Sequence, residues 1–318
     1  MATTTRKVKI ETPKFELDTL DLQIQRSMVL LAAKPAMGKS YSVVKLVLDG
    51  KRLGFNVFVI DRDRGLADEI RTQCGGKIPD NLQYKLARKW TDMEGALDYA
   101  FETLEPQDWL VFEHVGRLWD FAQEDYTKEV YGKTMAQRLR VLRSEAEELI
   151  REGNLDLNSK SGKDEAGKIR SRGVGYQGLD GRKDWAVIKS AHNGDIFDRV
   201  LLDGHFNVLS TTSVTGIDRN DENSIKLWSE WATLGVRPEG EKHQRYRHST
   251  VAYAYRKGKQ FLWRTDLGAD EGKDRGRDLV KDVDMTDVGF VRSWAEYHGI
   301  WAPSAPAERP RKKIVVKR

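Results

Sequence analysis

The octapeptide AKPAMGKS, residues 33–40, constrains the fold of this chain more than any other segment. It follows a short apolar run, residues 28–33, and precedes a stretch with helical character, residues 40–49, that ends near Gly50. A buried strand, a tight loop and a helix in direct succession bring the backbone N–H groups of the loop and of the helix N-terminus around one small volume. The sequence therefore predicts an α/β fold that begins with an anion-binding loop.

The residue types in this loop specify the anion as a nucleotide phosphate. The pattern G-x-x-x-x-G-K-[S/T] is met at its end by Gly38, Lys39 and Ser40, while Ala33 stands in place of the first glycine. A lysine here places positive charge on the β- and γ-phosphates, and the following hydroxyl ligates Mg²⁺. A chance Gly-Lys-Ser turn is the alternative, and the strand–loop–helix context weighs against it. We predict that ATP and Mg²⁺ bind to Ala33, Lys34, Pro35, Ala36, Met37, Gly38, Lys39, Ser40 and Tyr41.

Further short apolar runs follow at residues 56–60, 82–86 and 109–112, and helical segments separate them. This alternation is typical of a mainly parallel sheet with helices on both faces. Residues 206–212 add another apolar run. Two runs separated by a glycine-containing turn, residues 250–265, predict a C-terminal β-hairpin.

Two of the predicted strands end in carboxylates. Asp61 and Asp63 close the run at 56–60, and Glu113 closes the run at 109–112. A carboxylate at the end of a strand beside a phosphate loop can hold Mg²⁺ or orient the attacking water. A solvated strand end is the alternative for each. We predict that Ser40, Asp61 and Glu113 hold the metal, and we leave open whether Asp63 or Glu113 orients the water.

Together these segments resemble the RecA-like branch of the P-loop ATPases, over roughly residues 29–277, and most closely the short RecA-like ATPases of bacteriophages linked to single-strand annealing and recombination. The resemblance implies that Asp63 activates water and that Glu113 lies on the metal side. It also implies a γ-phosphate sensor, Thr211 or Thr212, and a basic element that reaches a neighbouring subunit's ATP. The catalytic residues implied are Lys39, Asp63, Glu113, Thr212, Lys273, Arg275 and Arg277.

The resemblance also implies partners and a location. It predicts action on DNA, in single-stranded form, by a homo-oligomer in the bacterial host cytoplasm, with phage single-strand-binding or replication proteins as further partners. Three departures bear on it: Ala33, Glu113, and threonines where the bacterial recombinase has a glutamine. The alternatives are a DNA-packaging motor subunit, a small-molecule kinase, and a module that binds nucleotide without turnover.

Outside the motifs, composition divides the chain into regions. We expect a polar arm over residues 1–15, an ATPase domain over 16–301 and a basic tail over 302–318, which by itself accounts for the formal net charge of +5. Within the domain, residues 116–183 form an insertion. Its part at 153–183, rich in glycine, serine and lysine, is expected to be a long loop or a disordered segment.

Charge and hydropathy bear on the partners. With a mean hydropathy of -0.62 and no apolar run near the roughly 20 residues that span a bilayer, no membrane partner is expected. Residues 236–264 interleave basic side chains with aromatic rings, a combination that binds single-stranded nucleic acid. The alternative is a hairpin with its rings in the core and its charges solvated. His243 and His248 are interpreted as surface residues without a metal role.

Overall fold

The computed structural model describes residues 26–300, except for 175–177, 180–182, 269–270 and 275–277. The predicted arm at 1–15, the tail at 302–318, and Arg275 and Arg277 therefore lie outside the described residues. The first half of the chain alternates strands and helices: β1 (Met28–Ala33), α1 (Lys39–Leu53), β2 (Val57–Asp61), α2 (Leu66–Gln73), β3 (Leu82–Leu86), α3 (Trp90–Thr103) and β4 (Trp109–Glu113).

A helical section and a mostly β section complete the described fold. The helical section contains α4 (Val115–Tyr131), α5 (Met135–Glu152), α6 (Lys160–Val174), α7 (Asp184–Lys189), a π-helical segment (Ser190–Asp198) and α8 (Arg199–Asp203). The final section contains β5 (Asn207–Thr212), β6 (Val214–Gly216), α9 (Glu222–Leu227), α10 (Ser229–Ala232), β7 (Val236–Pro238), a 3-10 turn (Gln244–Arg247), β8 (Thr250–Lys257), β9 (Gln260–Arg264), β10 (Asp266–Gly268), β11 (Glu271–Asp274), β12 (Val283–Asp284) and α11 (Phe290–Tyr297).

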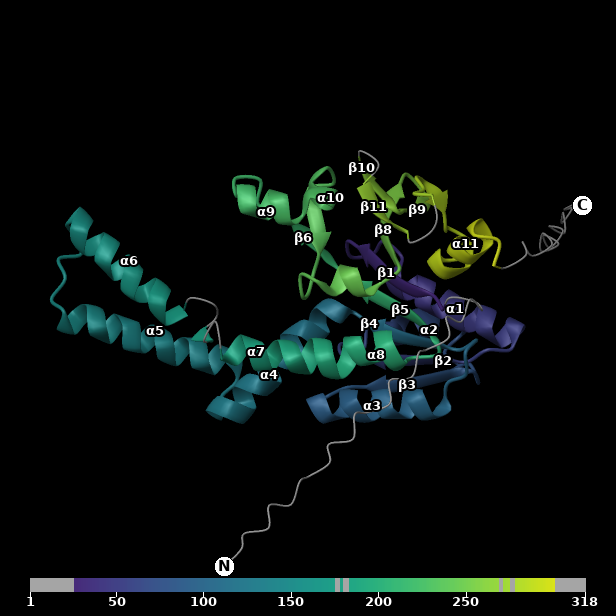
Figure 1. Cartoon of the computed structure of the whole chain (residues 1–318), viewed down its shortest axis with the longest axis horizontal. Helices are drawn as coiled ribbons and strands as arrows, with labels where there is room; N and C mark the ends of the chain where they lie inside the picture. Colours follow the sequence, from purple (N-terminus) through teal and green to yellow (C-terminus); the bar gives the residue numbers. More distant parts are fainter. Residues whose placement is uncertain (1–25, 175–177, 180–182, 269–270, 275–277, 301–318) are drawn as a thin grey trace, which may run out of the picture.

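The central sheet has the order β10-β11-β8-β1-β5-β4-β2-β3, and the strands from β8 to β3 are parallel (Figure 1). The loop strand β1 and the strand β4, which ends in Glu113, are thus separated by β5 alone. At the other edge, β8 and β9 form the predicted antiparallel hairpin. This is the mainly parallel α/β sheet that the sequence predicts.

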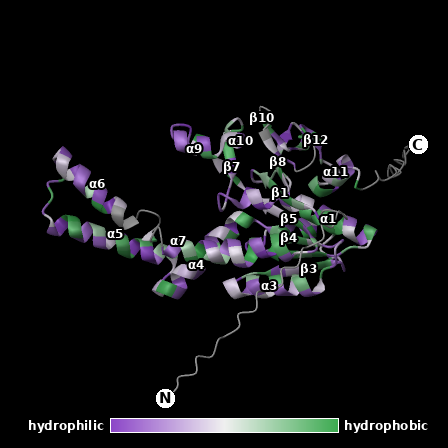
Figure 2. Cartoon of the chain, in the orientation of Figure 1, coloured by the Kyte–Doolittle hydropathy of each residue, from purple (hydrophilic) through white to green (hydrophobic). Residues whose placement is uncertain are grey.

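Burial on both faces explains why the strands read as continuous apolar runs. Alternate residues of β1 enter two different cores: Leu31 packs on one face with α1 and α11, whereas Leu30 packs on the other with α3. Every residue of β1 is buried, and in Figure 2 the central strands of the sheet are mainly hydrophobic, whereas the surface helices are mixed. The sheet is therefore covered on both sides.

The expectation of a long loop over residues 153–183 is wrong for its central part. Residues 160–174 form α6, which packs against α5 in a helical hairpin that extends away from the sheet (Figure 1). Small residues allow the two helices to approach: Ala166 is fully buried, as is Ala146 on α5 at 3% exposure. An ion pair between Arg170 and Glu147, 2.7 Å from Nε to Oε1, adds a polar contact. The helix could not be recognised from composition, because the face that it buries against α5 is a narrow row of small residues around Ala166.

Candidate functional site: the phosphate loop and its carboxylates

The loop folds as its sequence predicts, from the end of β1 to the start of α1. Gly38 has a φ of 90° and Ala36 a φ of 62°, so two positions of the loop are left-handed. This conformation costs an alanine about 1 kcal/mol, which the surrounding structure must offset. Ala33, in place of the usual glycine, is extended and fully buried, and it pairs with Ala254 of β8. The departure at Ala33 therefore does not disturb the loop.

The Lys39 side chain lies along its own loop. Its Nζ donates to the carbonyl oxygens of Ala33, at 3.0 Å, and Lys34, at 3.2 Å. Burial lowers the pKa of Lys39, and the negative charges of Glu113, Glu239 and Asp63 oppose this shift. A cation is thus held above the loop and within the field of three carboxylates.

Three elements meet at the carboxylate of Glu113, which ends β4. Ser40 of α1 donates its hydroxyl to Oε1 at 2.6 Å, and Thr211 of β5 donates to Oε2 at 2.8 Å. The residue is only 4% exposed. Burial raises the pKa of Glu113, and the two hydroxyl hydrogen bonds lower it. Strand order explains the meeting, since β5 lies between β1, which leads into the loop before Ser40, and β4, which ends in Glu113.

These groups suit Mg²⁺ bound together with a nucleotide. Mg²⁺ takes oxygen ligands, keeps several waters and is commonly bound through one or two protein groups plus substrate phosphates. Ser40 and Glu113 supply such oxygens in contact with each other. Across the described part of the chain, no group of three or more His, Cys, Asp or Glu side chains is arranged to hold a metal ion by itself. The donor set therefore fits a metal shared with a ligand.

Asp61, also expected at the metal, is engaged by its own loop. Its Oδ1 accepts from the backbone N–H groups of Asp63 at 2.9 Å and Arg64 at 3.1 Å, and its Oδ2 accepts from the Tyr84 hydroxyl at 2.9 Å. Asp61 is fully buried. In this structure its carboxylate shapes the turn that presents Asp63.

Asp63 itself is exposed and close enough to act on the site. Its Oδ1 accepts from the backbone N–H of Gly65 at 3.0 Å. Its negative charge raises the pKa of Glu113 and opposes the lowering of the pKa values of Lys39 and His114. The structure thus brings Asp63, Glu113 and Lys39 to one edge of the sheet. The sequence expected them there because the carboxyl ends of parallel strands meet at one edge.

Glu239 is a site residue that the sequence reasoning missed. Its main chain is tied to the end of β5: its carbonyl accepts from Thr212 Oγ1 at 3.0 Å, and its N–H donates to the carbonyl oxygen of Ser213 at 2.9 Å. Its Oε2 lies 4.0 Å from His114 Nε2, and its charge acts on Lys39. No sequence signal marked it, because the β6–β7 ribbon that brings it back has strands of only three residues.

His114 follows Glu113 in the chain and lies between the Glu113 carboxylate and the segment that carries Glu239. It has a left-handed φ of 69°, its Nδ1 accepts from the N–H of Arg117 at 3.3 Å, and its Nε2 therefore carries the proton toward Ser213 Oγ at 2.7 Å. Burial lowers its pKa, and the nearby Lys39 lowers it further. A neutral imidazole thus lies between Glu113 and Glu239.

The two candidate sensor threonines have different partners. Thr211 bonds the Glu113 carboxylate, whereas Thr212, the predicted sensor, donates to the Glu239 carbonyl. Lys273, from the predicted basic element, donates from Nζ to the carbonyl oxygens of Tyr246 at 3.0 Å and Arg245 at 3.1 Å. The roles assigned to Thr212 and Lys273 stay predictions.

The basic and aromatic segment is divided between structural and exposed residues. Arg245 pairs with Glu230 at 2.7 Å, and Arg247 pairs with Asp198 at 2.6 Å. Trp263 is fully buried. Arg256, Lys257 and Lys259 at the hairpin turn are exposed, and so are Lys242 and Tyr246 elsewhere in the segment. Part of the predicted nucleic-acid surface thus serves the core instead.

The interpretation of both histidines as surface residues is wrong for His248. That residue is 1% exposed, its Nδ1 lies 3.0 Å from the carbonyl oxygen of Gln244, and its Nε2 lies 2.8 Å from the hydroxyl of Ser210. The side chain of His243, in contrast, is half exposed. The 3-10 turn over Gln244–Arg247 turns one histidine inward and leaves the other outside.

The fold and this loop define an α/β protein with a mainly parallel sheet and a Gly-Lys-Ser loop between its first strand and first helix. No protein-family model matches the chain, and no curated protein matches it. Among solved structures, it is similar to one described as an ATPase domain, with a TM-score of 0.38 and 9% sequence identity over 85% of this chain and 83% of that chain. Within the described residues, every helix is too short or too polar to cross a bilayer.

Proposed function

We propose that this chain is a Mg²⁺-dependent ATPase that acts on single-stranded DNA as a homo-oligomer. The observation that carries the proposal is the contact of Ser40 and Thr211 with the buried Glu113 carboxylate, beside the cation of Lys39. A hydroxyl, a carboxylate and a lysine at a phosphate loop are the protein groups that phosphoryl transfer requires.

The residues divide the chemistry between them. Lys39 leaves the carbonyl oxygens of its loop to contact the phosphates, and Ser40 with Glu113 holds the metal. When bound, Mg²⁺ neutralises charge that develops on the β- and γ-phosphate oxygens. Glu113 is buried whereas Asp63 is exposed and acts on Lys39, so Asp63 is the better candidate to orient water. Thr212, at the end of β5, and His114, directly after β4, would then sense the γ-phosphate.

The DNA and oligomer parts rest on different residues. The exposed Arg256, Lys257 and Lys259 at the β8–β9 turn provide positive charge, and Tyr253 and Tyr255 stack on each other at 5.8 Å on the adjoining strand. Basic groups beside aromatic rings suit single-stranded DNA. For the oligomer, Lys273, Arg275 and Arg277 are proposed to contact ATP bound by a neighbouring subunit.

The test is ATP hydrolysis with and without single-stranded DNA. Lys39→Ala is expected to abolish turnover, whereas Lys51→Ala, an exposed lysine in the last turn of the same helix, is expected to leave it unchanged. The double variant Lys257→Ala, Lys259→Ala should lose stimulation by DNA and keep the DNA-free rate. Turnover that is indifferent to DNA would refute the DNA part.

A module that binds nucleotide without turnover is the second candidate. The observation in its favour is that Lys39 and Glu113 are both satisfied by the protein's own groups. Saturable Mg-ATP binding without hydrolysis, with or without DNA and at concentrations that permit oligomers, would support this candidate and refute the ATPase.

A further inference from the structure

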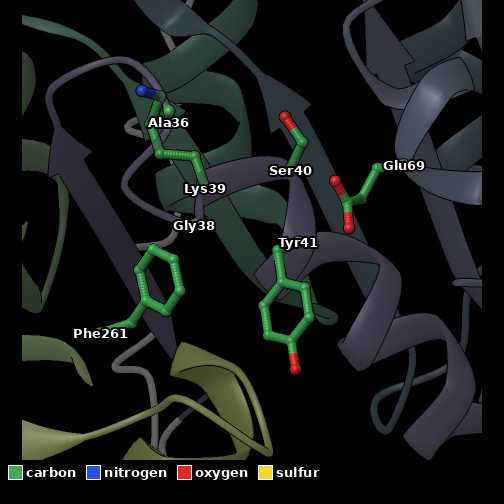
Figure 3. Close-up of a pocket in the computed structure, with 7 residues that line it drawn as sticks. All are labelled: Ala36, Gly38, Lys39, Ser40, Tyr41, Glu69 and Phe261. Carbon is green, nitrogen blue, oxygen red and sulfur yellow. The ribbon is translucent and has the colours of Figure 1, made fainter. Parts of the chain in front are cut away.

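We infer that the cavity on the α2 side of the phosphate loop receives the base and ribose of the nucleotide, with Phe261 and Tyr41 against the base and Glu69 accepting hydrogen bonds from the ribose hydroxyls. This inference rests on the proposed function, because it extends the same site. The cavity has a volume of about 370 Å³ and is lined by Ala36, Gly38, Lys39, Ser40, Tyr41, Glu69 and Phe261 (Figure 3).

The lining residues give the cavity a direction. At one end, Gly38, Lys39 and Ser40 belong to the phosphate loop and to the N-terminus of α1, where phosphates bind. The three acids that act on Lys39 do not line this cavity and lie on the γ-phosphate side. A nucleotide whose terminal phosphate faces those acids therefore extends its ribose and base into the cavity.

Two aromatic residues from distant parts of the chain line its wall. Tyr41 follows Ser40 on α1, and Phe261 belongs to β9. Both are tied to Thr286: the Tyr41 hydroxyl donates to its carbonyl oxygen at 3.1 Å, and the Phe261 N–H donates to its Oγ1 at 2.9 Å. Met285 N–H donates to the Phe261 carbonyl at 2.9 Å.

Because the Tyr41 hydroxyl and the Phe261 main chain are held by hydrogen bonds, little freedom of these residues is lost when a planar base binds. Phe261 is half-buried and offers no hydrogen-bonding group, so it contributes through the ring face alone. Stacking of a base on an aromatic ring is worth about 1–3 kcal/mol, which corresponds to about 5- to 150-fold in affinity. The Phe261 ring lies directly beside the loop, since a Cβ at Gly38 would be in ordinary van der Waals contact with it at 3.7 Å.

Glu69 provides the polar group of the cavity. It lies on α2, is half-buried, and turns its carboxylate toward the space between Ser40 and Tyr41 (Figure 3). Its Oε1 accepts from Gln73 Nε2 at 2.9 Å, and among the described residues no donor is recorded for its Oε2. An ionised carboxylate only accepts hydrogen bonds, and vicinal ribose hydroxyls are suitable donors.

The test compares three ligands, each as its Mg²⁺ complex: ATP, 2′-deoxy-ATP and tripolyphosphate, with 3′-deoxy-ATP as a fourth where the 2′-deoxy compound binds like ATP. Affinity is measured by calorimetry for the native protein, Phe261→Leu, Glu69→Gln and the control Asp68→Asn. Asp68 is the neighbour of Glu69 on α2, its side chain is 89% exposed, and it lies outside the cavity.

Phe261→Leu is expected to weaken ATP about 10-fold and to leave tripolyphosphate unchanged, which also shows that the variant folds. The native protein is expected to prefer ATP to one deoxy-ATP by about 10-fold, and Glu69→Gln should remove most of this preference. Asp68→Asn should behave as the native protein does.

The outcomes separate this inference from the proposed function. Failure of the native protein to bind either ATP or tripolyphosphate would overturn the nucleotide site itself. Binding of both, with ATP affinity unchanged in Phe261→Leu, would overturn the base subsite while the phosphate loop stands. A ribose preference that is absent in the native protein, or that persists in Glu69→Gln, would overturn the role of Glu69.

Discussion

His248 makes the stability of this protein depend on pH in a way that can be calculated. Burial lowers the pKa of this imidazole from 6.5 to about 4, and the charges of Lys273 and Arg247 contribute to the lowering. Because the folded pKa lies below the unfolded one, the unfolded chain takes up a proton as the pH falls below about 6.5 while the folded chain does not. The stabilisation is therefore complete above pH 6.5 and is lost toward pH 4.

The magnitude follows from the two pKa values. From pH 6.5 down to pH 5, a span of about 1.5 pH units, only the unfolded state takes up this proton. The free energy of unfolding therefore falls by about 2 kcal/mol between pH 8 and pH 5. His192, whose pKa is also lowered to about 4 by burial, adds a similar loss. Replacing His248 by glutamine should remove one of these two contributions and leave the other.

The assay is the free energy of unfolding in urea at pH 8, 6 and 5. His248→Gln is expected to be less stable at pH 8, because the contacts of the imidazole with Gln244 and Ser210 are lost. Its free energy of unfolding should, however, fall by about 2 kcal/mol less than that of the native protein between pH 8 and pH 5.

The matched control is His243→Gln, on the same turn and with a half-exposed side chain, which should keep the native pH dependence. Parallel curves for the native protein and His248→Gln would refute the reasoning, since they would mean that His248 binds protons equally in both states. We expect His248→Gln to affect the site as well, because Ser210, the partner of His248, is adjacent on β5 to Thr211, which bonds Glu113.

Two further predictions concern how the site is held. Tyr84→Phe removes the hydroxyl that bonds Asp61, so we expect about 1 kcal/mol of lost stability and a fall in kcat with little change in ATP affinity, measured by urea unfolding and steady-state kinetics; a change in affinity alone would contradict it. Gly116→Ala places a Cβ 3.0 Å from the Cβ of Glu239 and should lower both stability and turnover, whereas Gly95→Ala, in open space on α3, should stabilise the fold by about 0.5–1 kcal/mol. Equal effects of the two alanines in thermal unfolding would contradict this interpretation of Gly116.

Much of the fold could be predicted from the sequence because its parallel strands are buried on both faces. Such strands leave continuous apolar runs, and the residue after each run then marks the carboxyl edge of the sheet. This is why Asp63 and Glu113 could be placed beside Lys39 before any coordinates. The helix α6 escaped this logic, since it buries one narrow row of small residues against α5 and otherwise reads as a polar linker.

The part of the site that could not be predicted depends on long-range return of the chain. Glu239 reaches the loop through a ribbon of two three-residue strands, and Tyr84 reaches Asp61 from the edge strand β3. Neither contact can be predicted from the spacing of residues in the sequence, because each depends on the length of a short element relative to the neighbouring one. Their consequence is that the turn carrying Asp63 is held from the outer edge of the sheet, while the segment after β7 brings Glu239 to the end of β5. The positions of the acids at this site therefore depend on two elements outside it, the edge strand β3 and the β6–β7 ribbon.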